Sequence, residues 1–284
     1  PGYNKQSNIL GYNSEFGGDM TGFLFGRQTY SVNGNRTNYN FAETASGNGW
    51  MVTNPAINRQ HSITHNQTFN ARATLEPLKD LTIDLTMNRT FAESTNDFYR
   101  FNDLSQQFES QSMMRTSTLT YSTISINSAF EKLSKDNGYE SKHFNNLLTT
   151  TTAVSEFLGG QNANSIGSLN GYANGYGKSQ QEVVIGAFMS AYTNGKVNER
   201  TVNPFNTMPL PNWTVNYNGL TKFEFMKKYV KNFVIRHGYT STVSMAGVQS
   251  NLNAVFDSNG DASARDLNNN FIAANNVQAV TMTE

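Results

Sequence analysis

The sequence predicts an all-β fold built from long antiparallel strands, and three observations support this prediction. First, the stretch LEPLKDLTIDLTMNRTF, residues 75–91, places mostly apolar side chains at odd positions and polar ones at even positions after a tight turn at 76–80. Alternation with a period of two is typical of a strand with one apolar face. Second, the segment before the turn alternates in the same way, so the two segments form a hairpin. Third, only 15% of the residues are charged, and aromatic residues make up 12%.

The alternation extends to other parts of the chain. Strands are expected at about residues 20–28, 60–75, 81–100, 113–123, 211–218 and 231–246. The stretch 124–208 instead shows helical spacing and Gly- and Asn-rich links, so we expect a large, partly helical insertion between strands. If each expected strand crosses from one side to the other, the turn at 221–231 should lie on the side opposite the 76–80 turn. Its basic composition instead suggests the same side as the 76–80 turn. Either a crossing lies within the insertion, or the strand at 113–123 does not cross.

Strand length separates two interpretations of the apolar face. In a soluble β-sandwich this face meets a second sheet, whereas in an outer-membrane barrel it contacts lipid and the polar face lines the lumen. Soluble strands are typically about 5–6 residues long, and about ten tilted residues cross a hydrocarbon layer. The two strands of the hairpin exceed both lengths. We therefore expect residues 1–284 to be a fragment of one transmembrane β-barrel domain, with a soluble sandwich or adhesin as the alternative.

On the barrel interpretation, the two strand faces are the candidate site. Positions expected to face the lumen are Thr64, Asn66, Asn70, Arg72, Thr82, Asp84, Thr86, Asn88, Arg236 and Thr240. Positions expected to face lipid are Ile63, Phe69, Leu81, Ile83, Leu85, Met87, Phe233, Ile235 and Val243. The turn KFEFMKKYVK, residues 222–231, mixes apolar residues with lysines. It fits either an amphipathic cap at a membrane surface or a solvated turn.

Charge and composition exclude several classes of protein. The formal net charge of zero provides no basic surface for nucleic acid. Because there is no cysteine, disulfides and thiolate metal sites are excluded. The longest apolar run, residues 183–189, is too short to span a membrane as a helix, so a helical membrane protein is excluded. The chain opens without Met and ends in an alternating segment, and we expect it to be a piece of a longer polypeptide.

One stretch weakly resembles a calcium loop. Asp257, Asn259 and Asp261 alternate within DSNGD, and oxygens at every second position can converge on a hard cation. The sixth and twelfth positions, however, are Ala262 and Asn268 rather than Gly and a bidentate Glu. A polar external loop is therefore favoured over a metal site.

No other motif indicates catalysis or a cofactor. His61 and His65 are four residues apart on an expected strand, which separates them by about 13 Å, too far to share one zinc ion. Neither G-x-S-x-G nor H-E-x-x-H occurs in the chain. The sequence therefore predicts no catalytic residue, no cofactor and no firm metal site, and we do not expect an enzyme.

Seven segments between residues 20 and 246 carry a family resemblance. In order, they are TGFLFGRQ, NGW, FNARATLEPLKDLTIDLTMNRT, INSAFEKL, SQQEVVIGAFMSAYTNGK, PLPNWTVNYNGLTK and KNFVIRHGYTSTVSM. This series resembles the C-terminal part of the SprA/Sov family, the giant outer-membrane translocon of the type IX secretion system of Bacteroidetes. The loops between the segments and the C-terminal tail do not match in detail.

The resemblance implies a very large single-chain β-barrel in the outer membrane, whose lumen passes folded proteins, with a link to gliding motility in some members. It implies as partners the rest of the same barrel chain, a PorV-type outer-membrane protein, a periplasmic plug protein, secreted cargo proteins and the lipid bilayer. No nucleic-acid partner is expected. Two alternatives stay open: a segment of a nutrient-uptake barrel of the TonB-dependent type, and a soluble β-rich cell-surface adhesin.

Overall fold

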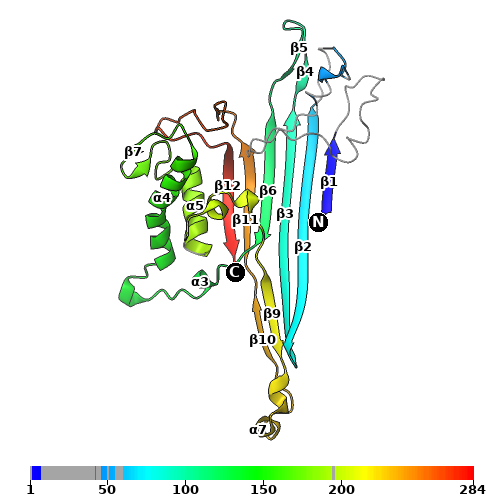
Figure 1. Ribbon diagram of the computed structural model, residues 1–284, viewed down its shortest axis with the longest axis vertical. Helices are drawn as coiled ribbons and strands as arrows, with labels where there is room; N and C mark the ends of the chain where they lie inside the picture. Colours follow the sequence, from blue (N-terminus) through cyan, green and yellow to red (C-terminus); the bar gives the residue numbers. More distant parts are fainter. Residues whose placement is uncertain (1, 8–41, 43–45, 50, 55–59, 194–195) are drawn as a thin grey trace.

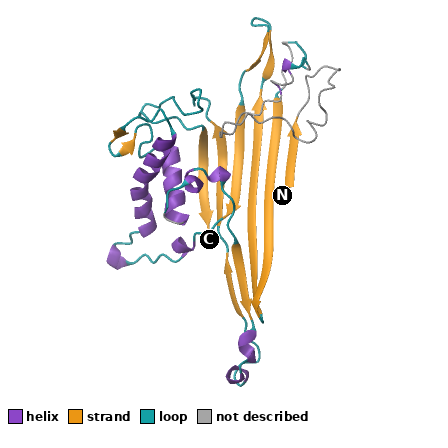
Figure 2. Cartoon of the chain, viewed as in Figure 1, coloured by secondary structure: helices purple, strands orange, loops and turns teal. Residues whose placement is uncertain are grey.

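The structure is a computed structural model that describes residues 2–7, 42, 46–49, 51–54, 60–193 and 196–284. The main feature of this part is one curled antiparallel sheet, and a helical layer lies against part of it (Figure 1, Figure 2). The sheet remains open among the described residues, with β1 at one edge and β12 at the other. The strand expected at 20–28 lies outside the described residues.

Eight strands of the described part form the sheet. They are β1 (Gly2–Ser7), β2 (His61–Leu78), β3 (Leu81–Asp97), β6 (Met114–Ser122), β9 (Asn212–Tyr217), β10 (Ile235–Tyr239), β11 (Thr242–Ser250) and β12 (Asn275–Thr283). Their order is β1-β2-β3-β6-β11-β12, while β9 pairs with β3 and β10. All of these pairs are antiparallel. Two small ribbons lie outside the sheet, β4 (Tyr99–Asn102) with β5 (Gln107–Ser110) and β7 (Ser168–Leu169) with β8 (Tyr172–Ala173).

The β2–β3 hairpin is the longest feature of the sheet. β2 has 18 residues and β3 has 17, and they pair along almost their whole length. Only Lys79 and Asp80 separate them, and Asp80 has a φ of 70°. Asp tolerates this left-handed conformation better than most residues. The alternating stretch at 75–91 thus forms a tight turn and one long strand.

β6 and β9 form one passage of chain beside β3, broken by the insertion. Residues 89–96 of β3 pair with β6, and residues 81–86 pair with β9. On the other side, β11 pairs with β6 and β10 pairs with β9. The insertion therefore lies within a strand, and the expectation that it lies between strands is wrong. The conflict in the number of crossings disappears, because β6 and β9 together make a single passage (Figure 1).

The side chain of Ser122 forms hydrogen bonds to both sides of this break. It is 1% exposed, and its hydroxyl accepts a hydrogen bond from the Asn88 backbone N–H at 3.1 Å and donates one to the Leu210 carbonyl at 2.7 Å. We expect Ser122→Ala to lower the free energy of unfolding by about 1–3 kcal/mol, because the Asn88 N–H and the Leu210 carbonyl both lose the hydroxyl that bonds to them. Chemical denaturation measures this loss.

Ser244→Ala is the matched control for that variant. The Ser244 hydroxyl makes an exposed contact of 3.2 Å with the Thr120 hydroxyl, so its removal is expected to change the free energy of unfolding little. Equal losses from the two variants would contradict the role assigned to Ser122.

The insertion carries most of the helical residues in the described part. Its elements are α3 (Ile126–Ala129), the 3-10 turn η1 (Lys135–Asn137), α4 (Lys142–Gln161), α5 (Gln181–Thr193), α6 (Glu199–Val202) and the 3-10 turn η2 (Pro204–Asn206). Ser141 caps the N-terminus of α4, and its side chain accepts a hydrogen bond from the Phe144 N–H at 3.1 Å. Two further short elements, η3 (Gly219–Lys222) and α7 (Glu224–Lys227), lie between β9 and β10.

Two apolar clusters hold the insertion in place. Met189 of α5 packs against Leu119, Tyr121 and Met245 on the sheet. A second cluster packs Val154 of α4 against Val183 of α5 and includes Phe271 of the loop before β12. The side chains of α5 thus contribute both to the sheet-facing cluster and to the inner cluster, which explains its apolar sequence.

A β-bulge keeps the apolar face of β11 continuous. The register on β6 shifts between Met245 and Val248, and Gly247 lies there with a φ of 61°. In a regular strand, two residues three positions apart point to opposite faces, and the extra residue of the bulge brings Val248 to the same face as Met245. With it, both residues are 1% exposed in the same cluster.

Candidate functional site: the two faces of the sheet

One face of the sheet is a band of small, uncharged polar side chains. The pairing register brings the even-numbered residues of β2 and β3 together with those of β6, β9 and β10. This face holds Thr64, Asn66, Thr68, Asn70, Arg72, Thr74, Thr82, Asp84, Thr86, Asn88, Thr90, Ser94, Thr116, Thr118, Thr120, Asn212, Thr214, Asn216 and Arg236. Nine of the ten positions expected to face a lumen lie within these paired strands. Thr240 lies in the link between β10 and β11.

The charges on the polar face are partly neutralised by one another. Arg72 lies 3.3 Å from the Asp84 carboxylate, which also accepts a hydrogen bond from the Thr74 hydroxyl at 2.7 Å. Arg236 pairs with Asn216 across the β9–β10 ladder. The face therefore offers many hydroxyl and amide groups and little net charge to anything that contacts it.

The opposite face carries most of the apolar side chains of these strands, with polar residues such as Glu93 and Arg115 near its upper end, and it divides into two halves. In the lower half, toward α7, the register brings Leu81, Ile83, Leu85 and Met87 beside the apolar residues of the neighbouring strands. Their paired neighbours include Ala71, Ala73, Leu75, Trp213, Val215 and Tyr217, and Ile235 pairs with Tyr217. Leu75 is 48% exposed and Ile235 is 45% exposed. No described helix covers this half (Figure 1).

The upper half of the same face is covered by the insertion. Phe91, Leu119, Tyr121, Val243, Met245 and Val248 form the cluster with Met189 of α5. Val243 is fully buried there. The expectation that Val243 faces lipid is therefore wrong, because α5 covers the apolar face of the sheet in this upper half.

Two other expected lipid-facing positions differ from the rest. Phe233 precedes β10 and belongs to no strand, and it is 40% exposed. Ile63 pairs with Thr95 through its backbone, but its side chain lies outside the described part. Phe69 pairs with Arg89 on the same face as Leu85. Leu81, Ile83, Leu85, Met87 and Ile235 are thus brought together as the uncovered apolar surface.

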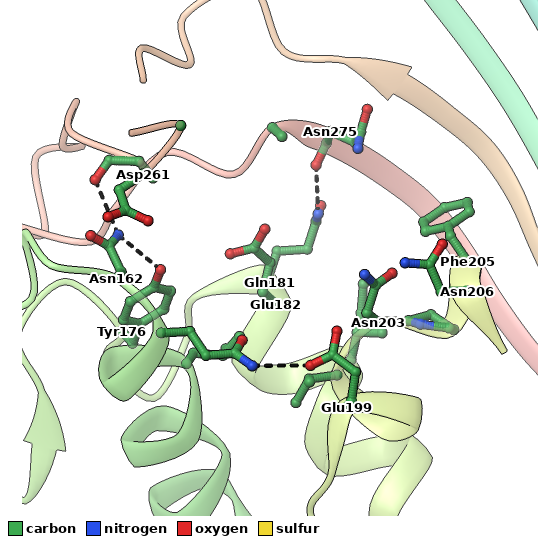
Figure 3. Close-up of a pocket in the computed structure, with 18 of the residues that line it drawn as sticks. Asn162, Tyr176, Gln181, Glu182, Glu199, Asn203, Phe205, Asn206, Asp261 and Asn275 are labelled. Atoms are coloured by element: carbon green, nitrogen blue, oxygen red, sulfur yellow. Dashed lines mark hydrogen bonds between the residues drawn. The ribbon is translucent and has the colours of Figure 1, made fainter. Parts of the chain in front are cut away.

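A cavity of about 570 Å³ lies between α4, α5, α6, η2 and the loop before β12 (Figure 3). The lining carries three carboxylates, from Glu182, Glu199 and Asp261, and no basic side chain. Among the described residues, no group of three or more acidic or His side chains is arranged to hold a metal ion. Periodicity did not predict this cavity, because segments far apart in the sequence line it.

Hydrogen bonds across the cavity tie the insertion to the C-terminal loop and to β12. Asn162 donates to the Tyr176 hydroxyl at 3.0 Å and to the Ala262 carbonyl at 3.1 Å. Gln181 of α5 donates to the Asn275 carbonyl at 2.7 Å. Burial raises the pKa of Tyr176 to about 12, so its phenol stays neutral at physiological pH. These contacts have a structural role, fixing the insertion against the last strand.

Glu182 makes the stability of this region depend on pH. Burial raises the pKa of its carboxyl, although a hydrogen bond from Gln180 at 3.0 Å opposes the shift. A carboxyl with a raised folded-state pKa binds more protons when folded, so its contribution to stability falls as the pH rises above its ordinary pKa. We expect Glu182→Gln to stabilise the protein at pH 7 and to have little effect near pH 4.

Thermal unfolding of the wild type and the variant at both pH values measures this effect. Glu156→Gln, at an exposed position of α4, is the control and should leave the pH dependence unchanged. A gain from Glu182→Gln that is equally large at pH 4 would show that the carboxyl's charge is not its cause.

The calcium-like stretch is a turn closed by its own hydrogen bonds. The Asp257 carboxylate accepts hydrogen bonds from the Asn259 and Asp261 backbone N–H groups at 2.8 and 3.0 Å. These bonds hold the pKa of Asp257 below its usual range. The Asp261 carboxylate accepts from the Ala163 N–H at 3.2 Å. Both carboxylates thus organise the loop and its contact with the insertion, in agreement with the polar-loop interpretation.

The polar face also includes residues of β9 that were not among the expected lumen-facing positions. Thr214 pairs with Asp84 and Gly238, and Asn216 pairs with Thr82 and Arg236. Both alternate with the apolar Trp213, Val215 and Tyr217 along β9, so the period of two that predicted the polar face of β3 also predicts that these two residues lie on it.

No helix of the described part is both long enough and apolar enough to cross a membrane. Comparison with protein-family models gives no match to the chain, and comparison with curated proteins gives none either. The two-faced antiparallel sheet is therefore the feature from which a function has to be argued.

Proposed function

We propose that this chain is part of a protein-conducting channel of the bacterial outer membrane, which exports folded cargo proteins in type IX secretion. The observation that carries the proposal is the pairing of a continuous, nearly uncharged polar face with an uncovered apolar face on one curled sheet. In a transmembrane barrel, the apolar face contacts lipid and the polar face lines a water-filled lumen. A lumen of Thr, Ser and Asn lets varied protein surfaces pass without binding them strongly.

The division of the apolar face supports a particular placement in the membrane. Its uncovered half spans residues 69–78 of β2 and residues 81–88 of β3, close to the roughly ten tilted residues that cross a hydrocarbon layer. The upper half, which α5 covers, would then extend beyond the lipid. The two-residue turn after β2 lies at the lower end, and outer-membrane barrels have their short turns on the periplasmic side. The insertion would therefore lie at the extracellular end.

The resemblance to the SprA/Sov family supplies the rest of the proposal. The resemblance implies that this sheet is one part of a very large single-chain barrel, with further strands beside β1 and β12. It also gives the PorV-type partner, the periplasmic plug protein and a role in gliding motility. Conduction needs no catalytic residue or cofactor, and we propose none.

Site-specific photo-crosslinking in living cells tests the proposal. A photoreactive phenylalanine analogue replaces Thr214 on the polar face or Leu85 on the apolar face, at nearly the same height of the sheet. We expect Thr214→photoreactive residue to give covalent adducts with secreted proteins, and the Leu85 variant to give adducts with lipid. A Thr214 variant that yields no protein adduct while secretion continues would contradict a protein-conducting lumen.

The two alternatives give different results in the same cells. A nutrient-uptake barrel would give no secreted-protein adduct, and its loss would reduce uptake rather than secretion. A soluble adhesin would be released from the cell envelope by salt, whereas a barrel segment requires detergent. The denatured mass of the detergent-extracted protein adds a further check, since the proposal expects a band several times larger than 31.6 kDa.

A further inference from the structure

The segment between β9 and β10, residues 218–234, forms a tip at one extreme of the molecule (Figure 1). It contains η3 and α7 and packs against no other helix of the described part. Several of its large apolar side chains are exposed: Phe223 by 50%, Phe225 by 67%, Tyr229 by 78% and Val234 by 51%. Phe223 and Phe225 lie side by side, with ring centroids 6.1 Å apart. An exposed aromatic group of this kind marks an interaction surface.

The same tip carries a concentrated positive charge. Lys222 contacts the Asp80 carboxylate at the base of the tip. Lys227, Lys228 and Lys231 are exposed and form no ion pair within the described part of the chain. Glu224 is the one acidic residue among residues 218–234. The Lys228 ammonium lies 5.9 Å from the centroid of the Tyr229 ring, so the surface offers aromatic rings together with ammonium groups that no carboxylate of the described part neutralises.

The position of the tip fixes the depth at which it meets a membrane. Its residues begin directly after the last β9–β10 pair, Tyr217 with Ile235, which belongs to the uncovered apolar surface. If that surface spans the hydrocarbon layer, the tip lies at the depth of the headgroups. Aromatic rings favour that interfacial region, and lysines there are attracted by anionic lipids.

We propose that the tip binds anionic phospholipid headgroups at the periplasmic surface of the outer membrane, through Lys227, Lys228 and Lys231, with Phe225 and Tyr229 inserted between lipids. This inference rests on the proposed function, which supplies the bilayer and its orientation. The tip acts as an anchor that fixes the depth of the β9–β10 hairpin in the membrane.

The opposite end of the molecule provides a matched control. Leu104, in the turn between β4 and β5, is 96% exposed, and Figure 1 places this turn at the far extreme from α7. Residues 103–106 include no lysine or arginine. Leu104 thus shares exposure and an apolar side chain with the tip, but not its charge.

Fluorescence quenching in reconstituted vesicles tests the inference. The full-length protein carries an environment-sensitive fluorophore on Tyr229→Cys, Leu104→Cys or Leu85→Cys, in vesicles of phosphatidylcholine with or without phosphatidylglycerol. Lipids with nitroxide groups near the headgroup or deep in the acyl chain act as quenchers. We expect shallow quenching of the label at 229 that increases with phosphatidylglycerol, and no quenching at 104. Reversing the charge of Lys227, Lys228 and Lys231 to Glu should abolish the dependence on phosphatidylglycerol.

The outcomes separate this inference from the proposed function. Deep quenching at 85 without quenching at 229 overturns the lipid-binding tip and leaves the barrel standing. Quenching at 229 without quenching at 85 overturns the barrel and leaves a peripheral lipid-binding tip. Equal quenching at 229 in both lipid mixtures overturns the selectivity for anionic lipid. A label at 229 that is shielded in cells but never quenched by lipid points to an acidic protein surface instead and overturns the inference.

Discussion

Arginine in place of Leu85 is expected to reduce the stability of the membrane-inserted protein by about 2–4 kcal/mol, the cost measured for a cation on the lipid face at mid-bilayer depth. Leu85 lies between Ala73 and Trp213 on the uncovered apolar surface, so in the proposed membrane placement the guanidinium would face hydrocarbon. Ile235→Arg should cost less than Leu85→Arg, because Ile235 lies nearer the end of the strands and the effect falls toward the interface. Reversible unfolding from lipid vesicles measures both.

Thr214→Arg is the matched control for this variant. Thr214 lies on the polar face at nearly the same height, opposite Asp84 on one side and Gly238 on the other. The added guanidinium would lie in water beside a carboxylate, and the space over Gly238 can receive it, so we expect little loss of stability. The assignment of the two faces would be wrong if Thr214→Arg proved more destabilising than Leu85→Arg.

Leu119→Ala is expected to produce the second large effect, a loss of about 2–5 kcal/mol in the free energy of unfolding. Leu119 is fully buried between the sheet and α5, in contact with the cluster that contains Met189 and Met245. Removing its branched end leaves a cavity that helix and sheet together cannot fill. Chemical denaturation of the detergent-solubilised protein measures the loss.

Thr120→Ala is the matched control for Leu119→Ala, because it truncates the neighbouring side chain on the opposite face of the same strand. Thr120 is the next residue of β6, is exposed on the polar face, and contacts the Ser244 hydroxyl at 3.2 Å. We expect its removal to change stability by about 0.5 kcal/mol or less. If Leu119→Ala were equally mild, α5 would not cover this half of the sheet in solution.

The strands and helices were largely predictable, because their signals are local. The alternation at 75–91 predicted the turn and β3, and the helical spacing within 124–208 predicted helices where α4 and α5 lie. The break between β6 and β9 was not predictable in this way. Alternation shows that a segment is a strand with two different faces, but it does not show which part of β3 that segment pairs with.

The candidate site was predictable only in part, for a related reason. An apolar strand face has the same pattern whether lipid or a helix covers it, so Val243 and Leu85 looked equivalent in the sequence. The structure separates them, since one is fully buried and the other lies on the uncovered half. The cavity involves pairs such as Asn162 with Ala262, whose separation in the chain is far beyond any periodic signal.

The register around the break in β6 and β9 has a consequence for the history of the chain. On β3, Tyr121 lies opposite Arg89 and Asn212 lies opposite Thr86, which leaves places for Ser122 and Thr123 and for nothing more. On the other side, Ser122 lies opposite Thr242 and Trp213 opposite Tyr239, which leaves two places there as well, for Thr123 and Asn212. A chain that ran from Thr123 directly to Asn212 would be an uninterrupted strand in register with both neighbours.

Residues 124–211 are therefore an insertion at a single point of the sheet, and the strand pairing on both sides continues without a shift in register. Such an arrangement is what an insertion into an older, simple hairpin would leave behind. Shortening, lengthening or replacing this segment leaves the alignment of the strands around it unchanged, provided that another cover protects the apolar patch around Val243 and Met245.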